Sequence, residues 1–217
     1  VITAYYGPVV QNVTVTVADG RFWYSLGNGL GNGLDNNWYL DGNNASVVSS
    51  DGNKTTVQMG SGYRGDLWLA RSGKGKIVNV TPADYRYFAI KVGFKSQLVP
   101  GKNKPNGCIK LEIFDDGIKK IGPEYFGTGG DANNRYEILG ASEISTTEPN
   151  VLYYDLQSKY KTVTPTDWNQ VFDLVQCKFV IADFPETAQT YDLYWIRSFK
   201  SIEELQAFVD SENNTNE

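Results

Sequence analysis

Short segments in which apolar and polar residues alternate recur along the chain, and this pattern constrains the fold more than any other feature of the sequence. Residues 12–17 read Asn-Val-Thr-Val-Thr-Val, the period-two alternation of a strand with one buried face. The turn residues Asp51-Gly52-Asn53 separate two more such segments, 45–49 and 54–59, and predict a hairpin. Further strands are predicted at 66–70, 85–94, 108–114, 152–156, 174–182 and 193–199.

A single segment, near the C-terminal end, has the features of a helix. Ser201 and Glu204 have the spacing of a capping box, and Leu205, Phe208 and Val209 supply an apolar stripe. About ten strands and one helix predict an all-β fold, in which two antiparallel sheets pack face to face as a jelly-roll β-sandwich with a short C-terminal helix.

Residues 1–210 are predicted to form one domain, because no linker interrupts the succession of strands. Residues 1–10 are open to a second interpretation, as the end of a preceding module. The polar residues 211–217 are predicted to be a disordered tail.

Charge and composition exclude several classes of protein. The net charge is −5 with both signs scattered, so the basic stripe of a nucleic-acid-binding protein is missing. No apolar run is long enough to span a membrane. The chain has no His, which removes the commonest zinc ligand and general base. Cys108 and Cys177 fit either buried thiols or one disulfide.

Aromatic residues make up 13% of the chain and include five Trp and fourteen Tyr. A sugar presents an apolar C–H face and a rim of hydroxyl groups. Flat aromatic rings match the face, and the planar polar groups of Asn, Asp, Gln and Arg match the rim. This composition therefore predicts a carbohydrate-binding protein.

Two segments combine both kinds of group. The candidate ligand-binding residues are Asn37, Trp38, Tyr39, Tyr63, Arg64, Asp66 and Trp68. Period-two alternation places Arg64, Asp66 and Trp68 on one face of a strand, with the core on the opposite face. Two alternatives stay open, in which Trp38 closes the core and the second segment is a surface ion pair beside a partly covered indole.

No catalytic residue is assigned. Glu112 and Asp115 are close in sequence, but they point to opposite faces of a strand and make a poor pair for glycoside hydrolysis. Asp51-Gly52-Asn53 resembles only a fragment of a calcium loop. No cofactor is expected, and a structural calcium ion is the one metal left open.

Several motifs resemble an uncharacterised Bacteroidetes domain family found in proteins of polysaccharide-utilisation systems. The motifs are residues 63–66, 87–91, 151–156, 179–183 and 194–201. The resemblance implies a galactose-binding-like jelly roll similar to carbohydrate-binding modules. It also implies a lipid-anchored protein of the outer surface or periplasm with neighbouring modules. Related modules carry Asp before the final Trp-Ile pair; here Tyr194 takes that place, which puts a bound calcium ion in doubt.

The sequence therefore predicts a non-catalytic, extracellular glycan-binding domain. A glycoside hydrolase or polysaccharide lyase on the same scaffold, and a structural spacer, are the alternatives. The glycan itself is not specified by any motif.

Overall fold

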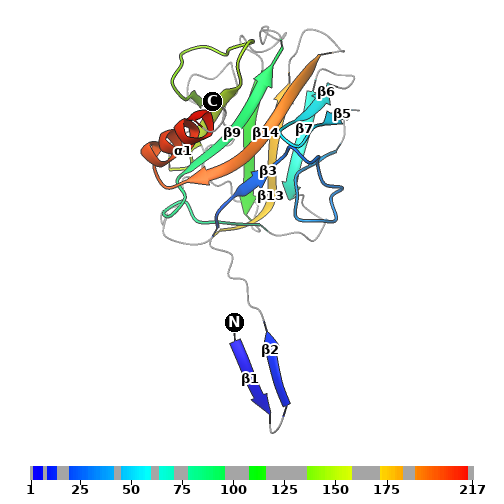
Figure 1. Cartoon of the computed structure of the whole chain (residues 1–217), viewed down its shortest axis with the longest axis vertical. Coiled ribbons are helices and arrows are strands. Elements are labelled where there is room, and N and C mark those ends of the chain that lie inside the picture. The colour runs from blue at the N-terminus through cyan, green and yellow to red at the C-terminus, as the bar shows by residue number, and fades with distance from the viewer. Residues whose placement is uncertain are drawn as a thin grey trace.

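The computed structural model is an antiparallel β-sandwich with one C-terminal helix, which confirms the predicted fold class (Figure 1). It describes residues 2–6, 9–13, 20–41, 45–59, 64–70, 78–95, 108–115, 136–157, 172–182 and 189–214. Two segments in which the sequence predicts loops between strands, 100–107 and 123–134, lie outside the described residues.

Two sheets form the sandwich. The larger sheet contains β3 (Trp23–Ser25), β5 (Ser46–Ser50), β6 (Thr55–Gln58), β9 (Tyr87–Phe94), β11 (Glu137–Ile138), β12 (Asn150–Asp155) and β14 (Thr190–Phe199). The smaller sheet contains β4 (Tyr39–Leu40), β7 (Arg64–Ala70), β8 (Val78–Val80), β10 (Cys108–Asp115) and β13 (Phe172–Ala182). A separate hairpin, β1 (Ile2–Tyr6) with β2 (Val9–Val13), pairs with neither sheet among the described residues.

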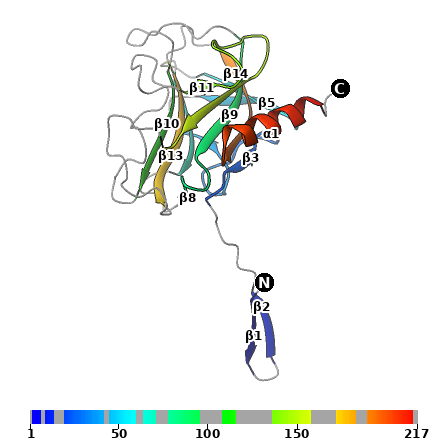
Figure 2. The ribbon, with the colours of Figure 1, turned by 90° about the vertical axis from the view of Figure 1, so that its left-hand side faces the viewer.

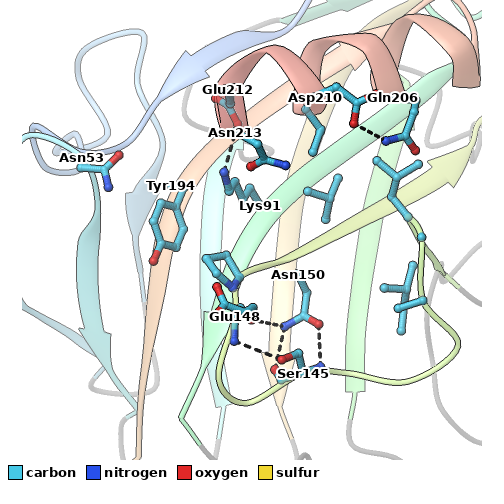
Figure 3. Close-up of a pocket in the computed structure, with 17 residues that line it drawn as sticks. Asn53, Lys91, Ser145, Glu148, Asn150, Tyr194, Gln206, Asp210, Glu212 and Asn213 are labelled. Carbon is cyan, nitrogen blue, oxygen red and sulfur yellow. Dashed lines mark hydrogen bonds and ion pairs between the residues drawn. The ribbon is translucent and has the colours of Figure 1, made fainter. Parts of the chain in front are cut away.

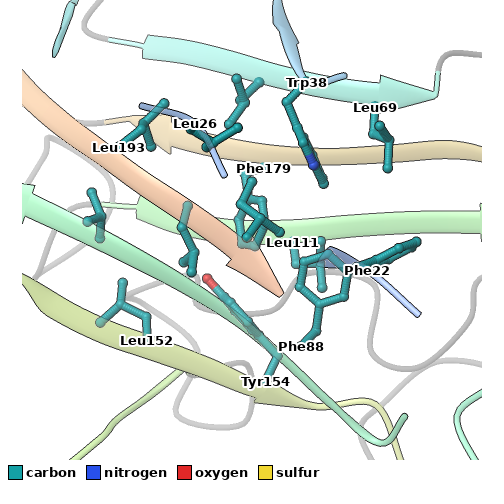
Figure 4. Close-up of a cluster of buried hydrophobic side chains, with 14 of the residues drawn as sticks. Phe22, Leu26, Trp38, Leu69, Phe88, Leu111, Leu152, Tyr154, Phe179 and Leu193 are labelled. Atoms are coloured by element: carbon teal, nitrogen blue, oxygen red, sulfur yellow. The ribbon is translucent and has the colours of Figure 1, made fainter. Parts of the chain in front are cut away.

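The main core lies between the inner faces of the two sheets (Figure 4). Leu67 and Leu69 of β7 both point into it, as their period-two spacing predicts. Ile90 and Val92 of β9 face them from the larger sheet. Cys177 of β13 is also buried there and carries a thiol rather than a disulfide bond.

A β-bulge interrupts the central strand β14. Leu193 pairs with Val92 and Trp195 with Lys91, so Tyr194 is an extra residue without a partner in β9. On the other edge of β14 the neighbouring strand also changes here, from β6 at residues 190–193 to β3 at residues 195–197.

The bulge reverses the alternation of β14. Tyr191 and Leu193 point into the main core before it, and Ile196 does so after it. Trp195 and Phe199 consequently lie on the outer face of the larger sheet. Two aromatic side chains are thus presented on a face that would otherwise meet solvent.

The helix α1 (Ile202–Asn214) covers these aromatics on the side of the larger sheet away from the smaller one (Figure 2). Leu205 is fully buried there. The ring of Phe208 lies 5.6 Å from those of Trp195 and Phe199 and 5.4 Å from that of Trp23. This second apolar cluster holds the helix to the sheet.

The ends of α1 follow from local hydrogen bonds and from packing. The predicted capping box is present in part: Glu204 N–H donates to Ser201 Oγ at 3.2 Å, and the Glu204 carboxylate accepts at Oε2 from the N–H of Lys200, one residue before the N-cap, at 2.7 Å. The helix continues to Asn214, so the disordered tail predicted for 211–217 is wrong for 211–214. The side chain of Glu212 bonds to the sheet and supports this last turn.

Replacing the N-cap in a Ser201→Ala variant is expected to lower the free energy of unfolding by about 1 kcal/mol, because the Glu204 N–H loses its acceptor. Urea unfolding followed by tryptophan fluorescence measures the change. Ser142→Ala, at an exposed loop position, is the matched control and should stay within about 0.5 kcal/mol of the parent. Equal stability of the two variants would contradict the capping role.

Candidate functional site

A groove lies between α1 and the outer face of the larger sheet (Figure 3). Its volume is about 840 Å³, within the usual range for sites that bind small molecules. The floor is formed by Lys91, Val151 and Tyr194. One wall is the second half of α1, and the other is the loop between β11 and β12; Asn53 reaches it from the β5–β6 turn. We call this the α1 groove.

Tyr194 is the aromatic group of the α1 groove, and it is the extra residue of the bulge in β14. Its ring lies over Gly93, where an added Cβ would be 3.6 Å from Cε2 and 3.8 Å from the hydroxyl oxygen. The Nζ of Lys91 lies 5.6 Å from the ring centroid. Burial raises the pKa of Tyr194, with partial opposition from the charge of Lys54, so the hydroxyl is protonated at neutral pH and can donate a hydrogen bond.

The loop wall is held in shape by one amide. Asn150 Oδ1 accepts from Ser145 N–H at 2.7 Å, and Asn150 Nδ2 donates to Ser145 O at 2.9 Å. Ser145 Oγ in turn accepts from Glu148 N–H at 3.0 Å. These bonds use the polar groups of Asn150 within the loop and leave the exposed Glu148 at the groove (Figure 3).

The helix wall is joined to the floor through Glu212. Its Oε2 accepts from Lys91 Nζ at 3.0 Å and from Trp195 Nε1 at 3.1 Å. Its Oε1 lies 3.7 Å from Nη1 of Arg197. The guanidinium of Arg197 is covered by aromatic rings, 4.3 Å from that of Trp23 and 4.4 Å from that of Phe208. The position of the wall is therefore set by both charge and packing.

A buried carboxylate lies two residues before Tyr194. Asp192 Oδ2 is 2.8 Å from Lys54 Nζ and 3.7 Å from Lys95 Nζ, and Oδ1 accepts from Thr56 Oγ1 at 2.6 Å. Burial raises the pKa of Asp192, but the hydrogen bonds from Lys54 and Thr56 and the charge of Lys95 lower it by more, so the pKa lies below its usual value.

The expectation that Trp38 is exposed to a ligand is wrong. The indole is 0% exposed and belongs to the main core (Figure 4). Its ring lies 5.7 Å from that of Phe179, 6.1 Å from that of Tyr24 and 6.4 Å from that of Phe88. The residue closes the core between the sheets, which is the alternative that the sequence left open.

Asn37 and Tyr39 flank Trp38 and do not form a site with it. Asn37 Oδ1 accepts from Trp38 N–H at 2.9 Å, and Asn37 N–H donates to Asp35 Oδ1 at 3.0 Å. The amide of Asn37 therefore serves a local turn. Tyr39 is buried and pairs with Trp68 across β4 and β7.

Asp66 and Trp68 lie on the face of β7 away from the core, as predicted, but they are buried, with exposed fractions of 5% and 8%. Lys178 of β13 accounts for this. Its Nζ lies 3.3 Å from Asp66 Oδ2 and 4.5 Å from the Trp68 ring centroid. The predicted exposed platform is instead an ion pair beside an indole. Arg64 begins β7; its side chain, and all of Tyr63, lie outside the described residues.

Trp23 is the most exposed indole among the described residues, at 44%. The guanidinium groups of Arg21 and Arg197 lie over its ring, 4.0 Å and 4.3 Å from the ring centroid. The α1 groove therefore offers a better aromatic contact at Tyr194. Sequence reasoning noted Tyr194 only as a departure from a related motif.

In the part of the chain that the structure describes, no three His, Cys, Asp or Glu side chains gather where they could hold a metal ion. None of the described helical segments is both long and apolar enough to cross a membrane.

The fold and the α1 groove define a β-sandwich domain whose outer sheet face and C-terminal helix enclose a polar site. Residues 29–205 match the family described as Domain of unknown function (DUF4979), and the chain belongs to this family. None of the curated proteins and none of the solved structures gives a significant match.

Truncating the buried indole in a Trp38→Ala variant is expected to lower the free energy of unfolding by about 3–5 kcal/mol, because it leaves a cavity between the sheets. Chemical unfolding measures the loss. Leu34→Ala, at a residue that is 94% exposed, is the control and should change stability by less than about 0.5 kcal/mol. A Trp38→Ala variant as stable as the control would place the indole outside the core.

Asp192→Asn is expected to lower stability at neutral pH, and its difference from the parent should shrink in acid. An aspartate with a lowered folded-state pKa stabilises the fold above the unfolded-state pKa of about 3.9. This contribution is lost as the pH falls through the folded-state pKa. Urea unfolding of both proteins from neutral to acid pH tests the expectation, and a difference independent of pH would contradict it.

Proposed function

We propose that the chain is a non-catalytic carbohydrate-binding domain and that the α1 groove is its binding site. The observation that carries the proposal is the ring of Tyr194, the extra residue of the bulge in β14, in the floor of a polar groove. Bulges are common next to functional sites, where they redirect a side chain.

The chemistry of the groove suits a pyranose ring. The face of Tyr194 provides a stacking surface, and stacking on a ring contributes about 1 kcal/mol beyond the area it buries. Asn53 and Asn213 border the same space, and each amide offers donors and an acceptor to neighbouring sugar hydroxyls (Figure 3). Lys91, fixed by Glu212, adds a donor beside the ring.

Glu148 and Asp210 lie on opposite walls of the groove, so the reducing-sugar assay described below tests for catalysis by this pair. The remaining carboxylate of the groove, Glu212, is not suited to that role. Both oxygens of this carboxylate face cations, and one also accepts from Trp195, so Glu212 acts as a link between helix and sheet. Hydrolysis of a glycoside needs two carboxyl groups held on either side of the bond. The contacts of Glu212 give it a structural task in place of that one.

The proposal includes an extracellular or outer-surface location, as the resemblance to proteins of polysaccharide-utilisation systems implies. A groove on the surface of such a domain would be accessible to polymeric glycans outside the cell. Binding should be weak, because a flexible chain loses freedom on a small contact area.

The test compares two substitutions of one ring. Tyr194→Ala should weaken binding to a neutral polysaccharide about tenfold, because it removes the stacking surface, whereas Tyr194→Phe should weaken it by less than about threefold. Affinity electrophoresis in gels containing hydroxyethyl cellulose, starch or galactomannan measures the retardation. Reducing-sugar assays on the same polymers should show no release.

Tyr153→Ala is the matched control, because Tyr153 is also a partly exposed tyrosine of the larger sheet but does not line the groove. It should bind as the parent does. Absence of binding to all the polymers, or full binding by Tyr194→Ala, would contradict the proposal.

A further inference from the structure

The charges of the α1 groove carry an inference about which glycans it takes, and this inference rests on the proposed function. We infer that the groove selects by charge, so that it binds amine-bearing sugar units more tightly than neutral ones and rejects uronate or sulfated units. The inference concerns the balance of charges around Tyr194.

The positively charged side chain of the groove already has a carboxylate partner. Lys91 is the one positively charged side chain among the described lining residues, and its Nζ lies 3.0 Å from Glu212 Oε2. A carboxylate or sulfate on a ligand would have to compete with Glu212 for this group. Arg197, which lies under the helix, faces the other oxygen of Glu212 at 3.7 Å and is buried.

Positively charged side chains near the rim of the groove also have acidic neighbours. Lys54 lies beside Asn53 and is 2.8 Å from Asp192 Oδ2, which Lys95 also approaches at 3.7 Å. The neighbouring carboxylate of Asp51 adds a second negative charge that acts on Lys54. The positive charges of this rim therefore have negative neighbours of equal number.

Among the described residues, no Lys or Arg forms an ion pair with the other two carboxylates of the groove, those of Asp210 and Glu148. Asp210 is exposed on α1 and accepts from the neutral amide of Gln206 at 2.8 Å, so its charge is not offset by that bond. Glu148 is exposed on the opposite wall. The helix wall contains no Lys or Arg, and its charged residues are Asp210 and Glu212.

This arrangement of charges determines that the groove prefers positively charged sugar units to negatively charged ones. An ammonium group on a bound sugar would lie in the field of Glu148 and Asp210, whereas a carboxylate there would be repelled by both. Each exposed charge pair changes an affinity by about two- to fivefold, so the two together predict about a tenfold difference between the amine and neutral forms of one polymer, and a larger difference between the amine and uronate forms. The difference should fall at high salt.

The experiment varies only the charge of the ligand. Hydroxyethyl cellulose, starch and galactomannan are each compared in three forms, untreated, oxidised at C6 to the uronate, and converted at C6 to the amine. Affinity electrophoresis with the full chain at low ionic strength should give the order amine, neutral, uronate for every polymer that binds.

The variant Glu148→Gln with Asp210→Asn removes both charges while keeping the shapes of the side chains. It should lose most of the preference for the amine, which is measured as the ratio of amine to neutral binding within the variant and so does not depend on how tightly the variant binds the neutral form. Glu143→Gln is the matched control, since Glu143 is exposed in the same loop but does not line the groove, and it should keep the preference.

The outcomes separate the two proposals. If neutral polymers bind through Tyr194 but the uronate forms bind equally or more tightly, the charge inference is overturned and the proposed function stands. A preference that survives in the double variant would come from the net charge of the whole chain, and would also overturn the inference. If no polymer binds in any form, both proposals fall.

Discussion

The bulge at Tyr194 is the constraint on which the rest of the larger sheet depends. β14 lies at the centre of this sheet and its side chains serve two cores, so its alternation has to match both. One extra residue moves Trp195 and Phe199 to the outer face and brings Ile196 into the main core. The carbonyl of Tyr194 accepts from Leu26 N–H at 2.8 Å, which fixes the bulge from the neighbouring segment.

The outer aromatics explain why the C-terminal helix is part of the domain. α1 is amphipathic, and alone a helix of this length would be marginal in water. Trp195 and Phe199 give its apolar face a partner, and Glu212 adds a polar bond to the same strand. The α1 groove exists only because the helix is held at this position, with its last turns beside the floor.

The sequence could predict the elements whose signals are local. The capping box at Ser201 and the inward direction of Leu67 and Leu69 were both predicted, because each depends on residues a few positions apart. Exposure could not be predicted in the same way. Trp38 and Trp68 were predicted to bind a sugar. Their burial depends on contacts with Phe179 and Lys178 of β13, which are remote in sequence.

The α1 groove was beyond sequence reasoning for the same reason. Its residues come from β9, β12, β14, the β5–β6 turn and α1, and no short motif joins them. A ligand in this groove would contact both the sheet and the helix, so it would bind only the state in which α1 is docked. Binding and docking of the helix are then linked, and each must strengthen the other. The contacts of Glu212 and Phe208, which hold the helix in its docked position, therefore belong to the physical basis of the proposed function.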